Sequence, residues 1–204
     1  MARQYFGTDG IRGRVNTPPM TAESALRLAI AAARTFAPNG SREVVIGRDT
    51  RRSGQMIEAA LIAGLTSMGL KPVLLGIVPT PTVALMTRET GAALGLMVSA
   101  SHNKSDDNGI KLFSPAGIKL TDAEEEALEA AMASAFEGDF APPPAISTPH
   151  HMKGATTLYL ERCLETVGTD IDFSGLKIVL DCAHGAAYEV GPAALRQLGA
   201  DVTI

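Results

Sequence analysis

Between Thr21 and Ala100 the chain alternates helix-like and strand-like segments three times. Apolar residues at helical spacing predict helices, and the short apolar, β-branched segments between them predict strands. The expected helices are 21–37, 55–69 and 82–90, and the expected strands are 43–49, 71–78 and 91–100. This alternation is typical of an α/β fold with a largely parallel sheet and helices on both faces.

Residues 109–114 are expected to add one more strand, which runs in the opposite direction. They follow Ala100 too closely for a parallel crossover, which needs about a dozen residues or more. We therefore predict a mixed, mostly parallel sheet. Residues 7–13 are rich in glycine and carry charges, which predicts a loop ahead of the first helix.

A further helix is expected over residues 122–136, with Thr121 as its N-cap. Its acidic residues are expected to form a solvated face, since carboxylates are favourable near a helix N-terminus. These residues are Glu124, Glu125, Glu126 and Glu129.

The proline-rich segment after residue 138 predicts a domain boundary. We expect a first domain over 1–138, a linker over 139–153 and the start of a second α/β domain over 154–204. The isolated pair His150–His151 is expected to be exposed in the linker. Because a single β-α-β unit buries too little surface to be a domain, we expect the chain to be the N-terminal part of a longer protein.

The composition is ordinary for a globular protein, with 46% hydrophobic and 20% charged residues. The net charge of −4 argues against a general nucleic-acid binder. No signal peptide and no apolar run of about 18 residues is present, so we expect a cytoplasmic protein that does not enter the membrane. Cys163 and Cys182 lack the spacing of a metal site, and we expect buried free thiols.

Three polar loops follow expected strands, at 47–54, 99–103 and 181–185. In open α/β sheets ligands bind beyond the carboxyl ends of the strands. The first two loops belong to the same expected sheet, so their polar side chains are candidates for a functional site. These candidates are Arg48, Asp49, Ser101, His102 and Asn103.

Two kinds of chemistry are open to Ser101. Adjacent residues such as Ser101 and His102 suit a nucleophile and its base poorly, and the G-x-S-x-G pattern of many hydrolases is absent. A serine that carries phosphate fits better, because a phosphate of about −1.5 to −2 charges needs cations nearby. Arg12, Arg48 and Lys111 are the candidate cations.

Five segments together resemble the α-D-phosphohexomutase superfamily. They are FGTDGIRG (6–13), GRDTRRSG (47–54), SASHN (99–103), DNGIKLFS (107–114) and DCAHGAA (181–187). The first and third are most similar to the bacterial branch that acts on hexosamine phosphates. Branches that act on mannose or glucose phosphates remain alternatives, as does a non-catalytic module that binds a phosphosugar or pairs with another subunit.

The resemblance implies a four-domain isomerase that moves phosphate between the 6- and 1-positions of a hexosamine. By motif match, Ser101 carries the phosphate, and His102 takes the place of the active-site histidine. Lys111 matches a general acid/base, and Arg12 matches an arginine that supports phosphoryl transfer. Asn103 and Arg48 are expected to bind phosphate or substrate.

The same resemblance implies partners for the reaction. They are the hexosamine phosphate substrate, and a bisphosphorylated sugar or an activating kinase that primes the serine. A homodimer is also expected, because the incomplete second domain would leave a strand edge open to pairing. Neither a membrane nor a nucleic acid is implied.

Two departures from the superfamily pattern are present. The residue after S-H-N is usually proline, and here it is Lys104, which should loosen the loop slightly. One Mg²⁺ per active site is implied, held by the phosphate on Ser101 and by the aspartates of a D-G-D-G-D-R loop. That loop is not in these 204 residues. Asp170 and Asp172 precede Phe173-Ser174-Gly175 and are expected to form a turn. We expect the metal and sugar loops beyond Ile204, and no activity from residues 1–204 alone.

Overall fold

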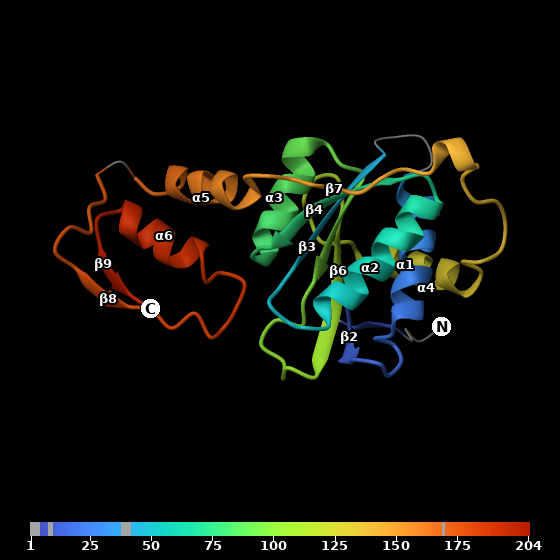
Figure 1. The fold of residues 1–204 in the computed structure, drawn as a ribbon, viewed down its shortest axis with the longest axis horizontal. Coiled ribbons are helices and arrows are strands. Elements are labelled where there is room, and N and C mark those ends of the chain that lie inside the picture. Colours follow the sequence, from blue (N-terminus) through green and yellow to red (C-terminus); the bar gives the residue numbers. More distant parts are fainter. Residues whose placement is uncertain (1–4, 8–9, 38–41, 169) are drawn as a thin grey trace.

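A computed structural model describes residues 5–7, 10–37, 42–168 and 170–204. They form a large α/β unit and a smaller C-terminal unit (Figure 1). The strands of the large unit are β1 (Phe6–Gly7), β2 (Gly10–Arg14), β3 (Glu43–Arg48), β4 (Lys71–Ile77), β5 (Leu94–Val98), β6 (Asp107–Phe113) and β7 (His150–His151). Its helices are α1 (Ala22–Phe36), α2 (Gly54–Ser67), α3 (Thr80–Thr90) and α4 (Asp122–Ala133). The C-terminal unit contains α5 (Ala155–Glu165), β8 (Lys177–Val179), α6 (Val190–Gln197) and β9 (Asp201–Thr203).

The large sheet has the order β1-β2-β6-β5-β3-β4-β7. Strands β5, β3, β4 and β7 run parallel, and β6, β2 and β1 add antiparallel pairs on the other side of β5. The predicted α/β class with a mixed sheet is therefore confirmed. In the C-terminal unit β8 and β9 form a separate parallel pair. No helix within the described ranges is long and apolar enough to cross a membrane.

The sheet has helices on both faces, as predicted. One face packs against α1, α2 and α4 through residues such as Leu28, Leu61 and Leu128, each with no exposed side-chain surface. The other face packs against α3 and the start of α5, through residues such as Val83 and Ala155. Strand β5 lies between these two layers and is buried along its whole length.

The prediction that residues 7–13 form a loop is wrong. The described residues of this segment belong to the antiparallel hairpin β1–β2, which forms one edge of the sheet. Gly10 has a φ of 85°, and a Cβ at this position would stand 2.4 Å from the Ile110 carbonyl oxygen. Glycine therefore allows β2 to approach β6. Ile11 then points into the core, with 1% of its surface exposed.

The prediction that the acidic residues of α4 form a solvated face is also wrong in part. Glu125 is fully buried and forms an ion pair with Lys119, at 2.6 Å between Oε1 and Nζ. Glu129 accepts hydrogen bonds from the backbone N–H groups of Tyr5 and Phe6, at 2.9 and 3.1 Å. Glu125 stays inside because it neutralises a lysine, and the half-buried Glu129 satisfies the amides of Tyr5 and Phe6.

The N-terminus of α4 agrees with the prediction. Thr121 is the N-cap and forms a reciprocal capping box with Glu124. The Thr121 backbone N–H and hydroxyl both donate to Glu124, and they hold the pKa of this carboxyl below its usual value. The acid pattern therefore identified the start of the helix correctly.

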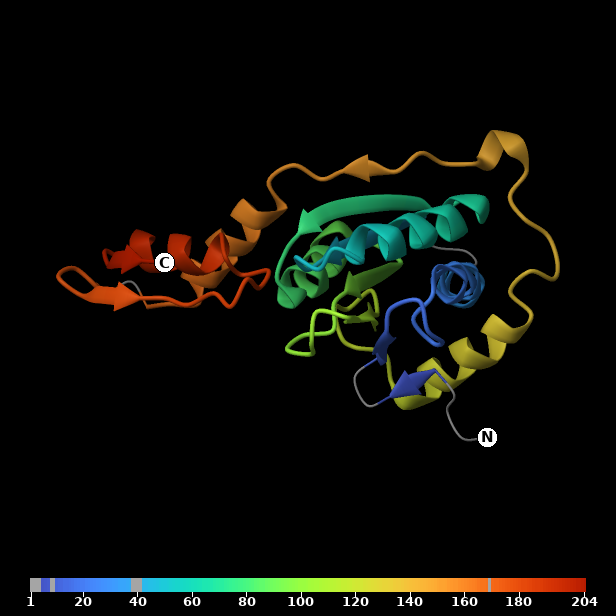
Figure 2. The same cartoon turned by 60° about the horizontal axis from the view of Figure 1, so that its bottom comes forward.

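The segment predicted as a linker runs around the outside of the large unit (Figure 2). It contains a 3-10 helix over Pro143–Ala145 and then β7, which pairs in parallel with Val73 and Leu74 of β4. His150 and His151 are exposed, as expected for residues of a linker. This segment thus contributes a short edge strand before it enters α5.

Two smaller predictions need adjustment. Helix α3 begins at Thr80 instead of residue 82, because Pro81 fits the first turn of a helix, where its missing N–H costs nothing. Cys163 and Cys182 are free thiols, as expected, but they are half-buried and not fully buried.

The contact of α1 with α2 gives a test of the packing. A Cβ on Gly64 would stand 2.6 Å from the Ala29 Cβ and 2.8 Å from the Leu26 carbonyl oxygen. We expect Gly64→Ala to lower the free energy of unfolding by about 1–3 kcal/mol, since the helices must separate. Urea unfolding followed by circular dichroism measures this change.

The matched control is Gly191→Ala in α6. Its Cβ would meet the Leu180 side chain at 3.5 Å, an ordinary contact. Alanine is favoured over glycine inside a helix by up to about 1 kcal/mol, so this variant should be neutral or more stable. A Gly64→Ala protein as stable as the Gly191→Ala protein would contradict the packing described here.

Candidate active site

The loop that follows β5 places Ser101 at the carboxyl edge of the parallel strands. Its φ of 58° lies in the left-handed region, which few residues other than glycine adopt. Its side chain is exposed, and its Oγ lies 3.4 Å from Nδ1 of the neighbouring His102. A side chain held on a strained backbone at a strand end is a common sign of a functional residue.

Arg51 holds this loop with its whole guanidinium group. Its Nε donates to the Asp49 carboxylate at 3.0 Å. Its Nη1 and Nη2 donate to four backbone carbonyl oxygens of the loop, at 2.5 to 3.0 Å. These carbonyls belong to Ser101, Asn103, Lys104 and Asp107. Arginine has five N–H donors, so all of them are used.

Asp49 and Ser99 complete the support beneath the loop. Asp49 is 7% exposed, and it accepts from the Ser99 hydroxyl at 2.7 Å as well as from Arg51. The Ser99 Oγ in turn accepts from the Ser101 backbone N–H at 3.0 Å. The buried carboxylate and the guanidinium neutralise each other, so neither is left as an isolated charge.

Ser101 opens into a cavity of about 990 Å³. Its walls come from three polar loops and the start of α3: residues 49–52 after β3, residues 99–106 after β5, and residues 183–187 of the C-terminal unit. Sequence analysis placed only the first two loops at one sheet edge. The structure adds the third and gives a site that both units share.

Four predicted site residues lie together at this cavity. Asp49, Ser101, His102 and Asn103 all line it. Arg12 reaches the same loop from β2, where its Nη1 donates to the Asn103 Oδ1 at 3.3 Å. Asn103 is also held through its Nδ2, which donates to Asp107 at 3.0 Å. A guanidinium group therefore contacts the Asn103 amide, two residues from Ser101.

Lys111 does not itself line the cavity, but it lies on β6, next to β5. It pairs with Met97 across β6 and β5, and Met97 lines the cavity. Paired residues of antiparallel strands point to the same face of the sheet. Arg12 pairs with Gly109, two residues from Lys111, so Arg12 and Lys111 also share that face.

The predicted site residue Arg48 does not line the cavity. It alternates with Val44 and Ile46 and therefore points to the face covered by α2. Its Nε pairs with Glu58 of α2 at 3.2 Å, and both side chains are mostly buried. This arginine is engaged in packing β3 against α2.

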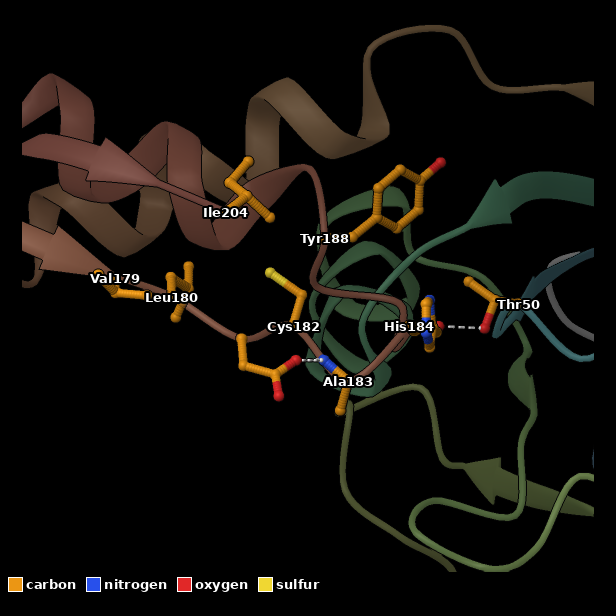
Figure 3. A pocket seen from close by; sticks show the side chains of 9 residues that line it. Thr50, Val179, Leu180, Cys182, Ala183, His184, Tyr188 and Ile204 are labelled. Atoms are coloured by element: carbon orange, nitrogen blue, oxygen red, sulfur yellow. Dashed lines mark hydrogen bonds between the residues drawn. The ribbon is translucent and has the colours of Figure 1, made fainter.

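The loop 181–187 is joined to the large unit by a hydrogen bond. The Thr50 hydroxyl donates to the His184 carbonyl oxygen at 2.5 Å, as Figure 3 shows. Ala183 and His184 both have left-handed φ angles, of 48° and 53°. The Ala183 N–H donates to the Asp181 carboxylate, which supports this turn. The same residues border an apolar cavity of about 570 Å³ beside β8.

Histidine, cysteine and carboxylate side chains are the usual metal ligands in proteins. Within the described part of the chain no three His, Cys, Asp or Glu side chains gather closely enough to hold a metal ion. Asp49 already accepts from Ser99 and Arg51. Asp170 and Asp172 lie in the C-terminal unit, where Asp172 accepts from the Ser174 backbone N–H. These residues do not form a complete metal site.

Sequence analysis missed three residues of this site. Arg51 was not among the predicted site residues. Ser99 was given no role in the site, and no contact was expected for Thr50. The spacing Asp49-x-Arg51 was the available signal, because an aspartate often accepts from the backbone two residues later, as it does here at 3.0 Å.

Fold and site together define an α/β domain that presents a serine next to a histidine and an asparagine at the carboxyl edge of its sheet. The family model for phosphoglucomutase/phosphomannomutase, alpha/beta/alpha domain I, matches residues 3–139. The chain therefore belongs to the phosphoglucomutase/phosphomannomutase family.

Curated relatives are similar over the whole chain. It is 71% identical over 204 residues to a phosphoglucosamine mutase of Hyphomonas neptunium, covering 100% of this chain and 45% of the relative. It is 52% identical to the enzyme of the same name from Caulobacter vibrioides, covering 98% of this chain and 45% of the relative. The chain thus spans about half the length of these relatives.

Solved structures agree on the fold. A candidate phosphomannomutase from Thermus thermophilus superposes with a TM-score of 0.82 at 31% identity, over 99% of this chain and 46% of that chain. A phosphoglucomutase/phosphomannomutase family protein from Burkholderia thailandensis gives a TM-score of 0.76 at 25% identity, over 95% of this chain and 42% of that chain.

The contact of Thr50 with His184 predicts how the third loop is held. We expect Thr50→Val to raise the rate of amide hydrogen exchange in residues 182–187, because the only change is the loss of the hydroxyl donor. Hydrogen exchange read by mass spectrometry measures it. Thr80→Val, at the start of α3, is the control and should leave that rate unchanged. Equal exchange in the wild type and the Thr50→Val protein would show that the bond does not hold the loop.

Proposed function

We propose that the longer protein to which this chain corresponds is a phosphoglucosamine mutase, which interconverts glucosamine 6-phosphate and glucosamine 1-phosphate. The observation that carries the proposal is Ser101, held in a left-handed conformation at the mouth of a cavity of about 990 Å³. The relatives of this name, at 71% and 52% identity, support the choice of hexosamine.

In the proposed reaction Ser101 carries a phosphoryl group between the two positions of the sugar. The Oγ–P bond of phosphorylated Ser101 breaks while a sugar hydroxyl oxygen forms a bond to the same phosphorus, and the hydroxyl proton passes to a base. The resulting bisphosphorylated sugar turns around and returns its other phosphoryl group to Ser101. Protein groups contribute mainly by positioning and by neutralising charge.

The proposed roles of the nearby residues follow from their chemistry. Arg12 offers N–H donors in a planar fork that suits phosphate oxygens, and Asn103 fixes its position. His102 lies beside the Ser101 Oγ. Lys111 is proposed as the general acid and base, since it shares a sheet face with Arg12 next to the cavity. Arg48 is not part of this proposal, because it pairs with Glu58.

The proposal extends to a metal ion and to the division of the chain. One Mg²⁺ would bind an oxygen of the phosphate on Ser101, with its other ligands from the rest of the longer protein. Residues 1–138 would form domain 1, 139–153 the linker and 154–204 the start of domain 2. The end of the family match at residue 139 supports this boundary.

Further parts of the proposal concern the cellular setting. A hexose 1,6-bisphosphate or an activating kinase would supply the first phosphate to Ser101. The expected cytoplasmic location and the homodimer are part of the proposal. Among the described strands β8 and β9 pair only with each other, and this supports an accessible strand edge.

A second candidate function is a phosphomannomutase or phosphoglucomutase activity of the same family. The superposition on the Thermus thermophilus protein at 31% identity favours it. Rates of the full-length enzyme with glucosamine, mannose and glucose phosphates distinguish the two functions. A non-catalytic sugar-binding module would show turnover of none of them.

Phosphorylation of Ser101 tests the proposal directly. After incubation with a hexose 1,6-bisphosphate, intact mass should rise by about 80 Da, the mass of one phosphoryl group, and peptide mapping should place it on Ser101. Ser101→Ala should remove the label and lower kcat roughly 10³-fold or more, because the covalent carrier is lost.

Ser134→Ala, an exposed residue at the end of α4, is the control and should keep both the label and the activity. A label on Ser99 or Ser105, or an active Ser101→Ala enzyme, would contradict the assignment of the carrier.

A further inference from the structure

Ser99, Asp49 and Arg51 form a closed ring of hydrogen bonds with the backbone of Ser101. The Ser101 N–H donates to the Ser99 Oγ at 3.0 Å, and the Ser99 hydroxyl donates to Asp49 Oδ2 at 2.7 Å. Arg51 Nε donates to that same Oδ2 at 3.0 Å, and its Nη2 donates to the Ser101 carbonyl oxygen at 2.9 Å. The ring therefore includes hydrogen bonds to both the backbone N–H and the backbone C=O of Ser101.

The directions of these bonds are fixed by chemistry. An ionised carboxylate can only accept, so the Ser99 hydroxyl must donate its single proton to Asp49. Its oxygen lone pairs are then turned toward the Ser101 N–H. A serine hydroxyl usually rotates freely, but here one rotamer alone satisfies both neighbours. Ser99 is 5% exposed, so water does not compete for these bonds.

The ring explains how Ser101 keeps an unfavourable backbone conformation. A residue with a Cβ avoids the left-handed region because the Cβ crowds the following carbonyl oxygen. The φ of 58° at Ser101 therefore needs support from outside the residue. The ring supplies this support through the N–H and the C=O. Because Cβ follows the backbone, the ring also sets the direction in which the Ser101 Oγ points.

Arg51 does not act as a phosphate ligand in this arrangement. Its five donors already have acceptors, and its charge is balanced by Asp49, with about 10% of each side chain exposed. Arg12 has a different environment, since it bonds the Asn103 side chain at the cavity. The two arginines thus have separate tasks, one beneath the loop and one beside it.

We propose that Ser99, Asp49 and Arg51 are positioning residues that aim the Ser101 hydroxyl, so that losing the Ser99 hydroxyl slows phosphoryl transfer without weakening substrate binding. The inference rests on the proposed function of Ser101 as the phosphate carrier. It assigns to the first serine of S-A-S-H-N a role distinct from that of the second. In-line transfer is sensitive to aim, because a displacement of about 1 Å can cost about 100-fold in rate.

The test compares variants of the full-length enzyme, with kcat expressed per phosphorylated Ser101. Ser99→Ala should lower kcat roughly 10- to 100-fold and leave KM within about twofold, since the substrate contacts are untouched. Arg51→Lys should act in the same direction, because lysine cannot reproduce the planar fork. The double variant should lose less than the product of the two single effects, because both act on one ring.

Matched controls distinguish an effect on the position of Ser101 from an effect on the stability of the enzyme. Ser134→Ala and Arg88→Lys change the same residue types at exposed sites outside the cavity, and they should leave kcat and KM unchanged. A purely structural effect of Ser99→Ala would reduce the amount of folded enzyme but keep kcat per phosphorylated site. That result, or a rise in KM with kcat preserved, would overturn the proposal.

Hydrogen exchange provides a readout that does not depend on activity. Residues 100–107 should exchange faster in Ser99→Ala and Arg51→Lys than in wild type, even if the enzyme acts on another sugar. Failure of the wild type to turn over any hexose phosphate would overturn the proposed function alone. Unchanged exchange in residues 100–107 would overturn the ring, whatever the activity.

Discussion

The arrangement of the whole site depends on how Arg51 is held. Strands β3 and β5 are neighbours in parallel register, with Arg48 opposite Val98 and the Asp49 N–H bonded to the Val98 carbonyl oxygen at 3.0 Å. The two chains therefore leave the sheet side by side. That adjacency lets a side chain from the first loop reach four carbonyl oxygens of the second. These bonds add to the Arg12–Asn103 bond and to the pairing of Asp107 with Arg14 of β2, which hold the same segment from its other side.

Much of this arrangement follows from the sequence pattern, and the rest depends on geometry that a pattern does not contain. Helix and strand alternation was enough to predict the fold class and to place Ser101 at a strand end. It did not distinguish Arg48 from Arg51. Both faces of β3 are buried, so its apolar residues show no alternation from which the direction of Arg48 could be read. Nor did this pattern indicate that the Lys104 carbonyl oxygen accepts from Arg51.

The errors at the sheet edge have a common physical origin. Residues 7–13 lack the β-branched composition of a strand, and α4 has the acidic composition of an exposed helix. In the structure these two segments contact each other. The backbone amides of Tyr5 and of Phe6, the first residue of β1, need acceptors, and the Glu129 carboxylate of α4 accepts from both. A long-range pairing over more than 100 residues leaves no periodic signal in either segment.

Strand β7 changes how far the C-terminal unit can travel. The predicted 15-residue linker would let the second unit explore a wide volume, but β7 is fixed on β4, so only Met152, Lys153 and Gly154 remain between it and α5. Three residues span at most about 10 Å. A short tether keeps the local concentration of loop 181–187 high at the cavity. One hydrogen bond from Thr50 can then hold the loop in place, where a freely moving unit would need a large interface.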